Sequence, residues 1–491
     1  MLQKRDILDA YDHAPAARFG VWVGIWVALC SSAVNIRSIS NDNIPNVLLP
    51  ISILRQGNLE LSEYQPLIAG HKDRVCYWAV KTEKGIYSRY PIWPAVVATP
   101  FFAPAVLFGP EVLDEAFLIR IGRFAAMAGC AAFAGLLAVT LRRCVSGAWA
   151  VAITFFTVMG STVQHQLGAN LSNQTLPIVC VAAVLFLIFR VEMSRPRALA
   201  AGLLAGLAVA ARLPVVFMAL ALLGVFVSQQ CWRRSLGYAV LGFSIFPLLT
   251  CVYQAVAFGS PFATGYGEEP NAGFNAPLWT GAGGLLISPT CGLFVYSPWV
   301  ILAFVGGWRC IQGRALNTSA NSLGRWLVLG FIGQWLLFST WWAWNGALSF
   351  GGPRLLAETL PALALLIAAG GILSTSGVTD AGRAARRLVM VLGVVSALHF
   401  LVGTAAYDAV APLNPVKPDF EYRADFLSLY LAKFGPRSLV MASLQRLAIL
   451  SAAFLIGGGM VWRILRPAHQ FRSGAGFECP SADTAAPAHP L

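Results

Sequence analysis

Apolar runs separated by short polar segments fill most of this chain. Many runs are roughly 17–25 residues long, which is enough for a helix to cross the hydrocarbon core of a bilayer. The pattern predicts an all-α fold, a polytopic transmembrane helical protein with about 12 spans. The predicted spans are Phe19–Ile36, Leu118–Leu141, Gly147–Val163, Leu176–Phe189, Ala198–Ala211, Pro214–Val227, Leu236–Ala257, Pro298–Gly307, Trp326–Thr340, Leu355–Leu373, Leu388–Ala405 and Leu439–Val461.

Composition and charge agree with a membrane class. The 491 residues are 57% hydrophobic and 12% charged, whereas soluble domains carry about 25% charged residues. With a cytoplasmic N-terminus, every inner segment is basic, as the positive-inside rule requires. The net charge of +13 therefore reflects topology and not nucleic-acid binding, and both termini are expected in the cytoplasm. Basic residues of the inner segments include Lys4, Arg5, Arg18, Arg142, Arg143, Arg195, Arg197, Arg233, Arg234, Arg309, Arg314, Arg325, Arg383, Arg386, Arg387, Arg463 and Arg466.

The first extracytoplasmic loop, residues 37–117, is expected to contain interfacial helices. Ile44–Arg55 places its apolar residues at helical spacing. Ile92–Phe108 is apolar enough to span, but it holds several prolines, each of which lacks a backbone donor. Counting it as a crossing would also place the later arginine clusters outside. We therefore predict that this segment lies in, or dips into, the outer interface.

The remaining segments complete the predicted organisation. Residues 1–470 are expected to form a single transmembrane domain, and residues 471–491 an Ala/Pro/Ser-rich disordered tail. The segment Phe258–Ser297 is rich in Gly, Pro and aromatic residues, as a flexible lid is. The sequence has no internal repeat of fixed period, which argues against an inverted-repeat transporter fold. It also has no CxxC or HExxH spacing, so no metal is expected.

Asp42 lies where the first predicted span leaves the bilayer, between Asn41 and Asn43. A carboxylate in this position can remove a proton from a hydroxyl at the membrane surface. It can equally be part of a helix start, because Asp or Asn is a common N-cap and Pro45 suits a first turn. The local pattern leaves both interpretations open.

Two arginines are candidates for binding a phosphate. Arg89 precedes Tyr90 and the predicted interfacial helix, where a guanidinium can hold a phosphate at headgroup depth; the alternative is a membrane-interface anchor. Arg212 joins two apolar runs, a costly position that marks a functional candidate. Snorkelling of its side chain to the interface is the alternative.

Tyr90, together with polar and aromatic residues near other span ends, is a candidate for binding the sugar or the acceptor. His165 and Asn170 belong to a polar turn between two spans, which lines a sugar site or forms a solvated loop. Trp344 belongs to a Trp cluster that can stack on a sugar or form an aromatic belt. Arg354 and Glu358 are four residues apart, so a mutual ion pair on one helix face is a strong alternative to a catalytic role.

Together these features resemble the C-type integral-membrane glycosyltransferases. The similarity is to the branch that uses polyprenyl-phosphate sugars, which includes protein O-mannosyltransferases and lipid A aminoarabinose transferases. It extends from the first span to about Pro361. Its motifs are Asp42 at the span exit, LPISILRQGNLEL (residues 49–61), the Tyr-Pro-Trp interfacial segment, Arg212 after its short span and SFGGPRLLAETLP (residues 349–361).

The resemblance implies residue roles and partners. Asp42 would be the general base, and Arg89 and Arg212 would hold the phosphate of a polyprenyl-phosphate sugar donor. Many relatives carry a second acid after the base, where this chain has Asn43, so a metal or amino-group role of that acid is not expected here. The implied reaction transfers the sugar, with inversion, to a glycan, lipid or protein acceptor on the extracytoplasmic face of the inner membrane.

Two other function classes remain open from the sequence. A transporter or flippase of lipid-linked glycans would also use intramembrane arginines and aromatics, but would distribute polar residues through the middle of its spans. A non-catalytic scaffold would leave the arginine at position 212 unexplained.

Overall fold

The computed structural model describes residues 2–34, 41–65, 78–109, 114–189, 192–267, 273–289, 291–345, 352–373, 380–410 and 426–465. Among these residues, five segments are helical, long and apolar enough to cross a membrane, and several shorter apolar helices accompany them. The long segments are Ala16–Val34, Ala116–Arg142, Trp232–Phe258, Gly382–Ala406 and Gly435–Gly459. The all-α, polytopic fold is therefore confirmed, while the number of 12 spans stays a prediction.

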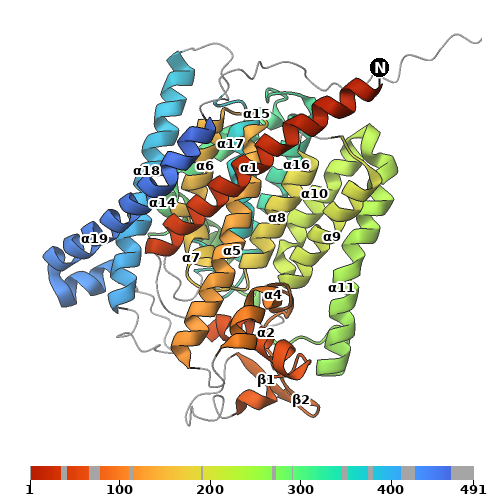
Figure 1. Cartoon of the computed structure of the whole chain (residues 1–491), viewed down its shortest axis with the longest axis vertical. Helices are drawn as coiled ribbons and strands as arrows, with labels where there is room; N and C mark the ends of the chain where they lie inside the picture. Colours follow the sequence, from red (N-terminus) through yellow and green to blue (C-terminus); the bar gives the residue numbers. More distant parts are fainter. Residues whose placement is uncertain are drawn as a thin grey trace, which may run out of the picture.

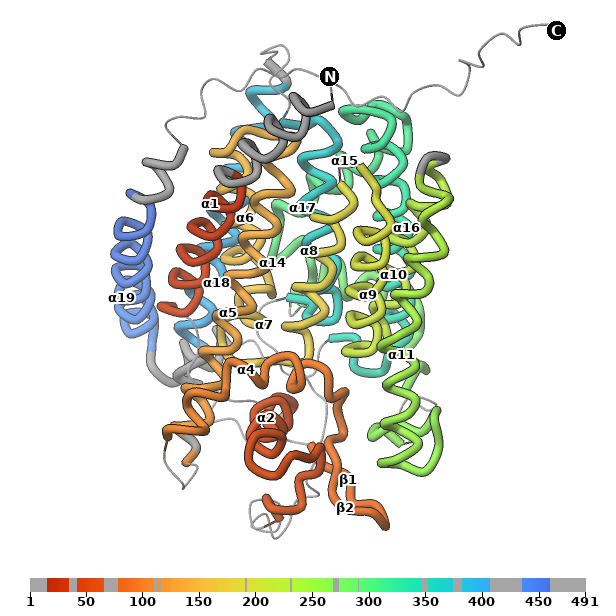
Figure 2. The backbone as a smooth tube through the Cα atoms, turned by 45° about the vertical axis from the view of Figure 1, so that its right-hand side comes forward, coloured from red at the N-terminus to blue at the C-terminus, as the bar shows by residue number. Residues whose placement is uncertain are grey.

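The helices form one bundle whose members run roughly side by side (Figures 1 and 2). The bundle helices are α1 (Leu2–Val34), α5 (Glu115–Arg142), α6 (Gly147–Met159), α8 (Thr175–Ile188), α9 (Arg195–Ala211), α10 (Val216–Ser228), α11 (Leu236–Phe258), α15 (Ile301–Ile311), α16 (Thr318–Ser339), α17 (Leu360–Ala369), α18 (Asp380–Val410) and α19 (Phe426–Leu465). Each predicted span overlaps a helix, although several extend beyond its ends, as Leu355–Leu373 does on both sides of α17, and residues 35 and 36 of the first span lie outside the described residues.

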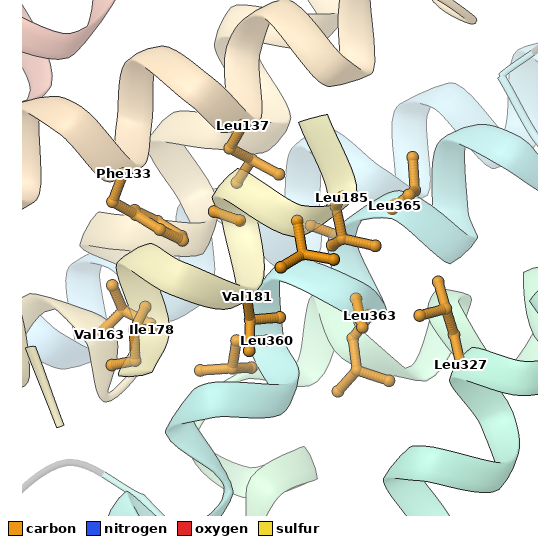
Figure 3. Packing of buried hydrophobic residues seen from close by; sticks show 14 of the residues in the cluster. Phe133, Leu137, Val163, Ile178, Val181, Leu185, Leu327, Leu360, Leu363 and Leu365 are labelled. Atoms are coloured by element: carbon orange, nitrogen blue, oxygen red, sulfur yellow. The ribbon is translucent and has the colours of Figure 1, made fainter. Parts of the chain in front are cut away.

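Helix α8 lies at the centre of the bundle. Its Ile178, Val181 and Leu185 face side chains from α5 and from α17, and all three are fully buried (Figure 3). A helix that is apolar all round can lie in such a core without exposing polar groups. The polar segment that precedes α8 is also buried, with Gln166, Asn170 and Ser172 in the interior.

Glycines allow close helix crossings. A Cβ at Gly24 of α1 would lie 2.2 Å from the carbonyl oxygen of Ala131 in α5. A Cβ at Gly202 of α9 would lie 1.9 Å from the carbonyl oxygen of Ala239 in α11. Small residues are the usual means by which membrane helices pack, because lipid provides no hydrophobic force between them.

Arginines cap helix C-termini at one end of the bundle, called the arginine end here. Arg143 donates to the carbonyl oxygens of Phe186 (2.6 Å) and Phe189 (2.7 Å) at the end of α8. Arg309 donates to Gly370 after α17 (2.6 Å), and Arg233 donates to Val227 of α10 (3.0 Å). These contacts satisfy orphan carbonyls and complement the negative end of each helix dipole.

The first loop lies at the opposite end of the bundle, called the loop end (Figures 1 and 2). It contains α2 (Ile44–Gln56), the 3₁₀ turn η2 (Ser62–Tyr64) and α4 (Trp93–Phe108), so the two helices predicted in this loop are present. The loop also contains an antiparallel hairpin of β1 (Ala79–Thr82) and β2 (Gly85–Ser88), which was not predicted. Val47, Ile51 and Phe102 join α2 and α4 to α5 through a shared apolar cluster.

Part of the predicted lid is helical. It contains α13 (Leu278–Ile287) and α14 (Leu293–Tyr296). Helix α13 packs closely on α16: a Cβ at Gly281 would lie 1.9 Å from the carbonyl oxygen of Ser339, and Trp335 donates to the carbonyl oxygen of Ala282 at 3.2 Å. The predicted disordered tail, residues 471–491, lies outside the described residues.

Candidate active site

Asp42 is held by three segments that are distant in sequence. It lies in the 3₁₀ turn η1 (Asn41–Asn43), between α1 and α2. Its Oδ1 accepts a hydrogen bond from the Tyr90 hydroxyl at 2.6 Å, and its Oδ2 forms an ion pair with Arg354 Nη1 at 3.1 Å. Its backbone carbonyl accepts from Asn173 Nδ2 at 3.2 Å. The side chain stays 27% exposed, so the carboxylate is fixed and still accessible.

The helix-cap alternative does not describe the role of this carboxylate. The N-cap of α2 is Asn43, which makes no side-chain capping hydrogen bond. Pro45 does occupy the first turn of α2, as expected. The carboxylate of Asp42 instead bonds to Tyr90 and Arg354, so its contacts belong to tertiary structure.

The hairpin directs Tyr90 toward Asp42. The backbone N–H of Arg89 donates to the carbonyl of Trp78 at 3.0 Å, which closes the end of the hairpin. The hydroxyl of Ser88 donates to the Tyr90 carbonyl at 2.9 Å and accepts from the Tyr90 N–H at 3.0 Å. Tyr90 is consequently buried, and only its hydroxyl end reaches the carboxylate.

Tyr266, in the loop after α11, covers both residues that follow the hairpin. Its ring meets the Tyr90 ring edge-on at a centroid distance of 5.7 Å. The Arg89 guanidinium carbon lies 5.8 Å from the centroid of the Tyr266 ring, a cation–π contact. Gly265 permits this approach, since a Cβ there would lie 2.5 Å from the Arg89 carbonyl oxygen. Arg89 is therefore adjacent to Tyr90 and held against a second loop.

Arg354 begins the 3₁₀ helix η6 (Arg354–Thr359), which leads into α17. Gly352, with φ of +87°, turns the chain just before it and lies against the Tyr296 ring. The Arg354 carbonyl accepts from Gln174 Nε2 at 3.0 Å, which ties η6 to the start of α8. The Arg354 side chain is 26% exposed, so the ion pair with Asp42 lies at an accessible surface.

Glu358 forms a second, deeper ion pair with Arg212. Glu358 is fully buried; its Oε1 pairs with Arg212, and its Oε2 accepts from Gln334 Nε2 at 3.0 Å. Gln334 also donates to the Leu355 carbonyl at 3.1 Å. The Arg212 guanidinium carbon lies 5.3 Å from the centroid of the Phe338 ring. This network fastens η6 to α9 and α16.

Arg354 and Glu358 thus pair with other segments and not with each other. The mutual pair considered from the sequence requires an α-helix, in which residues four apart share a face. The structure has a 3₁₀ helix here, with three residues per turn, so residues four apart point about 120° apart. Each side chain therefore reaches a different partner.

The polar turn between α6 and α8 is buried, so it is not a solvated loop. It includes the short helix α7 (Val163–Gly168). Asn170 has a structural role, since its Oδ1 accepts from Leu171 N at 2.8 Å within the turn and its Nδ2 donates to the Ile119 carbonyl of α5 at 3.4 Å. Burial, together with the positive charge of Arg354, lowers the pKa of His165 to about 4. A neutral imidazole thus lies near Arg354.

Trp344 occupies a different place. A Cβ at Gly284 of α13 would lie 2.0 Å from the Trp344 ring. The backbone N–H of Trp344 donates to the Trp341 carbonyl at 3.0 Å. In the described part of the chain, Trp344 therefore belongs to the contact between α13 and the end of α16. A role in sugar binding stays a prediction.

The structure therefore brings Asp42, Tyr90, Arg354 and His165 into one group, called the Asp42 cluster. Arg89 flanks it, and the Arg212–Glu358 pair joins it through η6. The sequence did not indicate the contributions of Asn46 and Tyr266. Asn46 is buried on α2 and its Nδ2 donates to Asn173 Oδ1 at 2.9 Å. A polar residue within the apolar stretch of α2 was the signal available for it.

Comparisons with known proteins give a limited result. No family model matches the chain, and no curated protein matches it. The solved structures similar to it include two of ArnT from Cupriavidus metallidurans. The structure bound to undecaprenyl phosphate is 15% identical, with a TM-score of 0.44, over 91% of this chain and 77% of that one. The apo structure is 17% identical, with a TM-score of 0.45, over 90% and 75%.

These similarities are too low to transfer a residue role from ArnT. The roles considered below therefore depend on the contacts of this chain. Within the described ranges, no group of three or more His, Cys, Asp or Glu side chains is placed to hold a metal ion.

Proposed function

We propose that this protein is a membrane glycosyltransferase that moves a sugar from a polyprenyl-monophosphate carrier to a hydroxyl of an envelope acceptor. One observation supports the proposal most strongly. Asp42 presents an accessible carboxylate at the loop end, fixed by Tyr90 and next to the Arg354 guanidinium. A base and a cation are the two groups that transfer from a phosphate-linked donor requires.

In the proposed reaction, the acceptor oxygen attacks the anomeric carbon of the donor sugar. The O–H bond of the acceptor breaks, and its proton passes to the Asp42 carboxylate. The bond between the anomeric carbon and the phosphate oxygen breaks with its electron pair, so the polyprenyl phosphate leaves as an anion. Attack from the face opposite the leaving group inverts the anomeric configuration.

The charge on the leaving phosphate grows in the transition state. Guanidinium groups placed there stabilise the transition state more than the ground state, which raises the rate. We assign this role to Arg89, which lies beside Tyr90 and is packed on Tyr266. Arg212 is the second candidate: its pairing with Glu358 neutralises its charge in part, but leaves other N–H groups of its five-donor fork available.

Tyr90 acts as a positioning residue in this mechanism. Its hydroxyl donates to Oδ1, which fixes the carboxylate plane and leaves Oδ2 facing Arg354. A base must be held within hydrogen-bond reach of the proton that it removes. The buried Tyr90 ring provides that restraint from the hairpin side.

We place the Asp42 cluster on the extracytoplasmic face of the inner membrane. The arginine end carries the helix-capping guanidinium groups of Arg143, Arg233 and Arg309, and positive charge favours the cytoplasmic side. Asp42 lies in η1, directly before α2, and α2, α4 and the hairpin lie at the other end (Figure 2). A carrier embedded in the outer leaflet would present its phosphate at this depth.

Reconstituted vesicles test the reaction class. The purified protein is supplied with a labelled polyprenyl-phosphate sugar and an acceptor extract, and the products are examined by mass spectrometry. We expect a new glycosidic bond with wild type and with Asp114→Asn, but not with Asp42→Asn. Asp114 is a matched control because it is an exposed carboxylate that caps α5 through Phe117 N. Movement of the label across the bilayer without a new bond would identify a flippase instead.

A further inference from the structure

We infer that Arg354 is a ligand of the donor phosphate, and that Asp42 holds its guanidinium until the phosphate takes it. This inference rests on the proposed function and deepens it. Donor binding would then exchange one partner of Arg354 for another and release the Asp42 carboxylate for the acceptor proton.

The two ion pairs of the site differ in how easily they can exchange partners. In the Asp42–Arg354 pair, both side chains are about a quarter exposed, at 27% and 26%. In the Arg212–Glu358 pair, Glu358 is fully buried and Arg212 is 14% exposed. Partly exposed pairs contribute little to stability, whereas breaking a buried pair leaves a stranded charge. Arg354 is therefore the guanidinium that a ligand can redirect at lower cost.

The hydrogen bonds of Arg354 leave one donor unsatisfied. Its contact with Asp42 is made by Nη1 at 3.1 Å, and its Nε is buried without a hydrogen-bond partner. An arginine fork is best matched by two oxygens of one carboxylate or phosphate. A phosphate that accepts from Nε and from a terminal nitrogen would remove the unsatisfied donor, which gives binding a driving force beyond charge.

The surroundings fix the backbone of Arg354 and leave its side chain able to move. Gln174 holds the Arg354 carbonyl, and Gln334 holds that of Leu355. Glu358 anchors the same segment to Arg212. A movement of the guanidinium from Asp42 to a phosphate therefore needs side-chain rotation alone.

Two neighbours prepare the cluster for this exchange. Tyr90 keeps its 2.6 Å bond to Oδ1, so Asp42 remains oriented when Arg354 leaves. His165, whose low pKa leaves it neutral near Arg354, adds no positive charge that would repel the guanidinium. A carboxylate relieved of its ion pair has more drive to accept a proton, so the base becomes active when the donor is present.

Binding of undecaprenyl phosphate, which carries no sugar, tests this inference without turnover. Affinities are measured in nanodiscs for wild type, Asp42→Asn, Arg354→Gln and the double variant, with undecaprenol as the lipid that lacks a phosphate. We expect Asp42→Asn to bind roughly twofold to fivefold more tightly, because its competition with the phosphate is removed. We expect Arg354→Gln to bind at least about tenfold more weakly.

The decisive comparison is the effect of Asp42→Asn in the two backgrounds. If the phosphate takes Arg354 from Asp42, the gain is larger with Arg354 present than in the Arg354→Gln protein. If Asp42 merely repels the phosphate, the gain is equal or larger in the Arg354→Gln protein, which would overturn the inference. Arg354→Lys keeps the charge without the fork and should bind with intermediate affinity, so the test survives if Arg354→Gln fails to fold.

The same data separate this inference from the proposed function. If wild type binds undecaprenyl phosphate no more tightly than undecaprenol, the proposal of a phosphate-linked donor is wrong. If wild type prefers undecaprenyl phosphate but the Arg354 variants bind it equally tightly, only the role given to Arg354 is wrong.

Discussion

The buried pair of Arg212 and Glu358 offers the sharpest test of the energetics at the site. Replacing Glu358 with Gln keeps an oxygen that can accept from Gln334 but leaves the Arg212 charge without its partner. Breaking a buried ion pair costs about 3–5 kcal/mol. We expect the lower end for Glu358→Gln and the upper end for Glu358→Ala, which also loses the bond from Gln334.

Removing both charges should reverse most of this loss. The double variant Arg212→Met/Glu358→Leu replaces the pair with apolar groups in an apolar setting, and such replacements are often neutral or stabilising. Its stability should therefore lie within about 1–2 kcal/mol of wild type. Thermal unfolding in detergent, followed by Trp fluorescence, measures these differences. For a chain of this size, a loss of about 3–5 kcal/mol should lower the midpoint by roughly 3–5 °C.

The transfer rate of the double variant then separates structural from catalytic roles of Arg212. If Arg212 serves only to hold η6, the double variant should recover both folding and most of the transfer rate. If Arg212 also holds the phosphate, folding should recover while transfer stays low. Single variants with unchanged stability, or a double variant whose loss equals the sum of the single losses, would refute the view that this pair is buried and coupled.

Three further predictions concern residues in and around the Asp42 cluster. Tyr90→Phe removes a hydrogen bond to a partly exposed carboxylate, which is worth about 1–1.5 kcal/mol. We therefore expect kcat to fall roughly tenfold, while the KM for the donor changes less than about twofold. A change mainly in KM would contradict a positioning role. Gly265→Ala places a Cβ 2.5 Å from the Arg89 carbonyl oxygen, at a cost of about 1–3 kcal/mol, and should raise the KM for the donor. The control variant Gly283→Ala adds a Cβ that meets nothing within 4 Å, so the KM for the donor should stay unchanged. Burial lowers the pKa of His165 from 6.5 to about 4, so below pH 6.5 the unfolded chain binds a proton that the folded protein does not. The free energy of unfolding should therefore decrease as the pH falls from 6.5 to 4. Thermal unfolding of His165→Gln should show a smaller decrease over the same pH range.

Much of the fold was predictable because it follows from local periodicity. Apolar runs such as those of α5 and α11 are long enough to be recognised without tertiary information. The apolar spacing of Ile44–Arg55 likewise predicts α2. The hairpin of β1 and β2 was missed because each strand has four residues, too few for alternation to stand out from loop sequence.

The site was predictable as a set of candidate residues, but its pairings were not. Asp42 and Arg354 are separated by 312 positions, and nothing local in either segment indicates the partner. The expected helix face of Arg354 and Glu358 failed because the segment adopts 3₁₀ geometry, and a change from 3.6 to 3.0 residues per turn redirects each side chain. The choice between the two geometries depends on tertiary contacts such as those of Gln334 with Leu355 and Glu358.

The role of Asp42 as the base is tested most directly by the single-turnover rate of sugar transfer. Wild type and Asp42→Asn are each loaded with a saturating polyprenyl-phosphate sugar, and transfer to the acceptor is followed by rapid quench. Loss of a positioned general base should lower the rate by about 10²–10⁴-fold, with donor binding retained or tightened. An Asp42→Asn protein that transfers sugar within a few-fold of the wild-type rate would contradict the assignment.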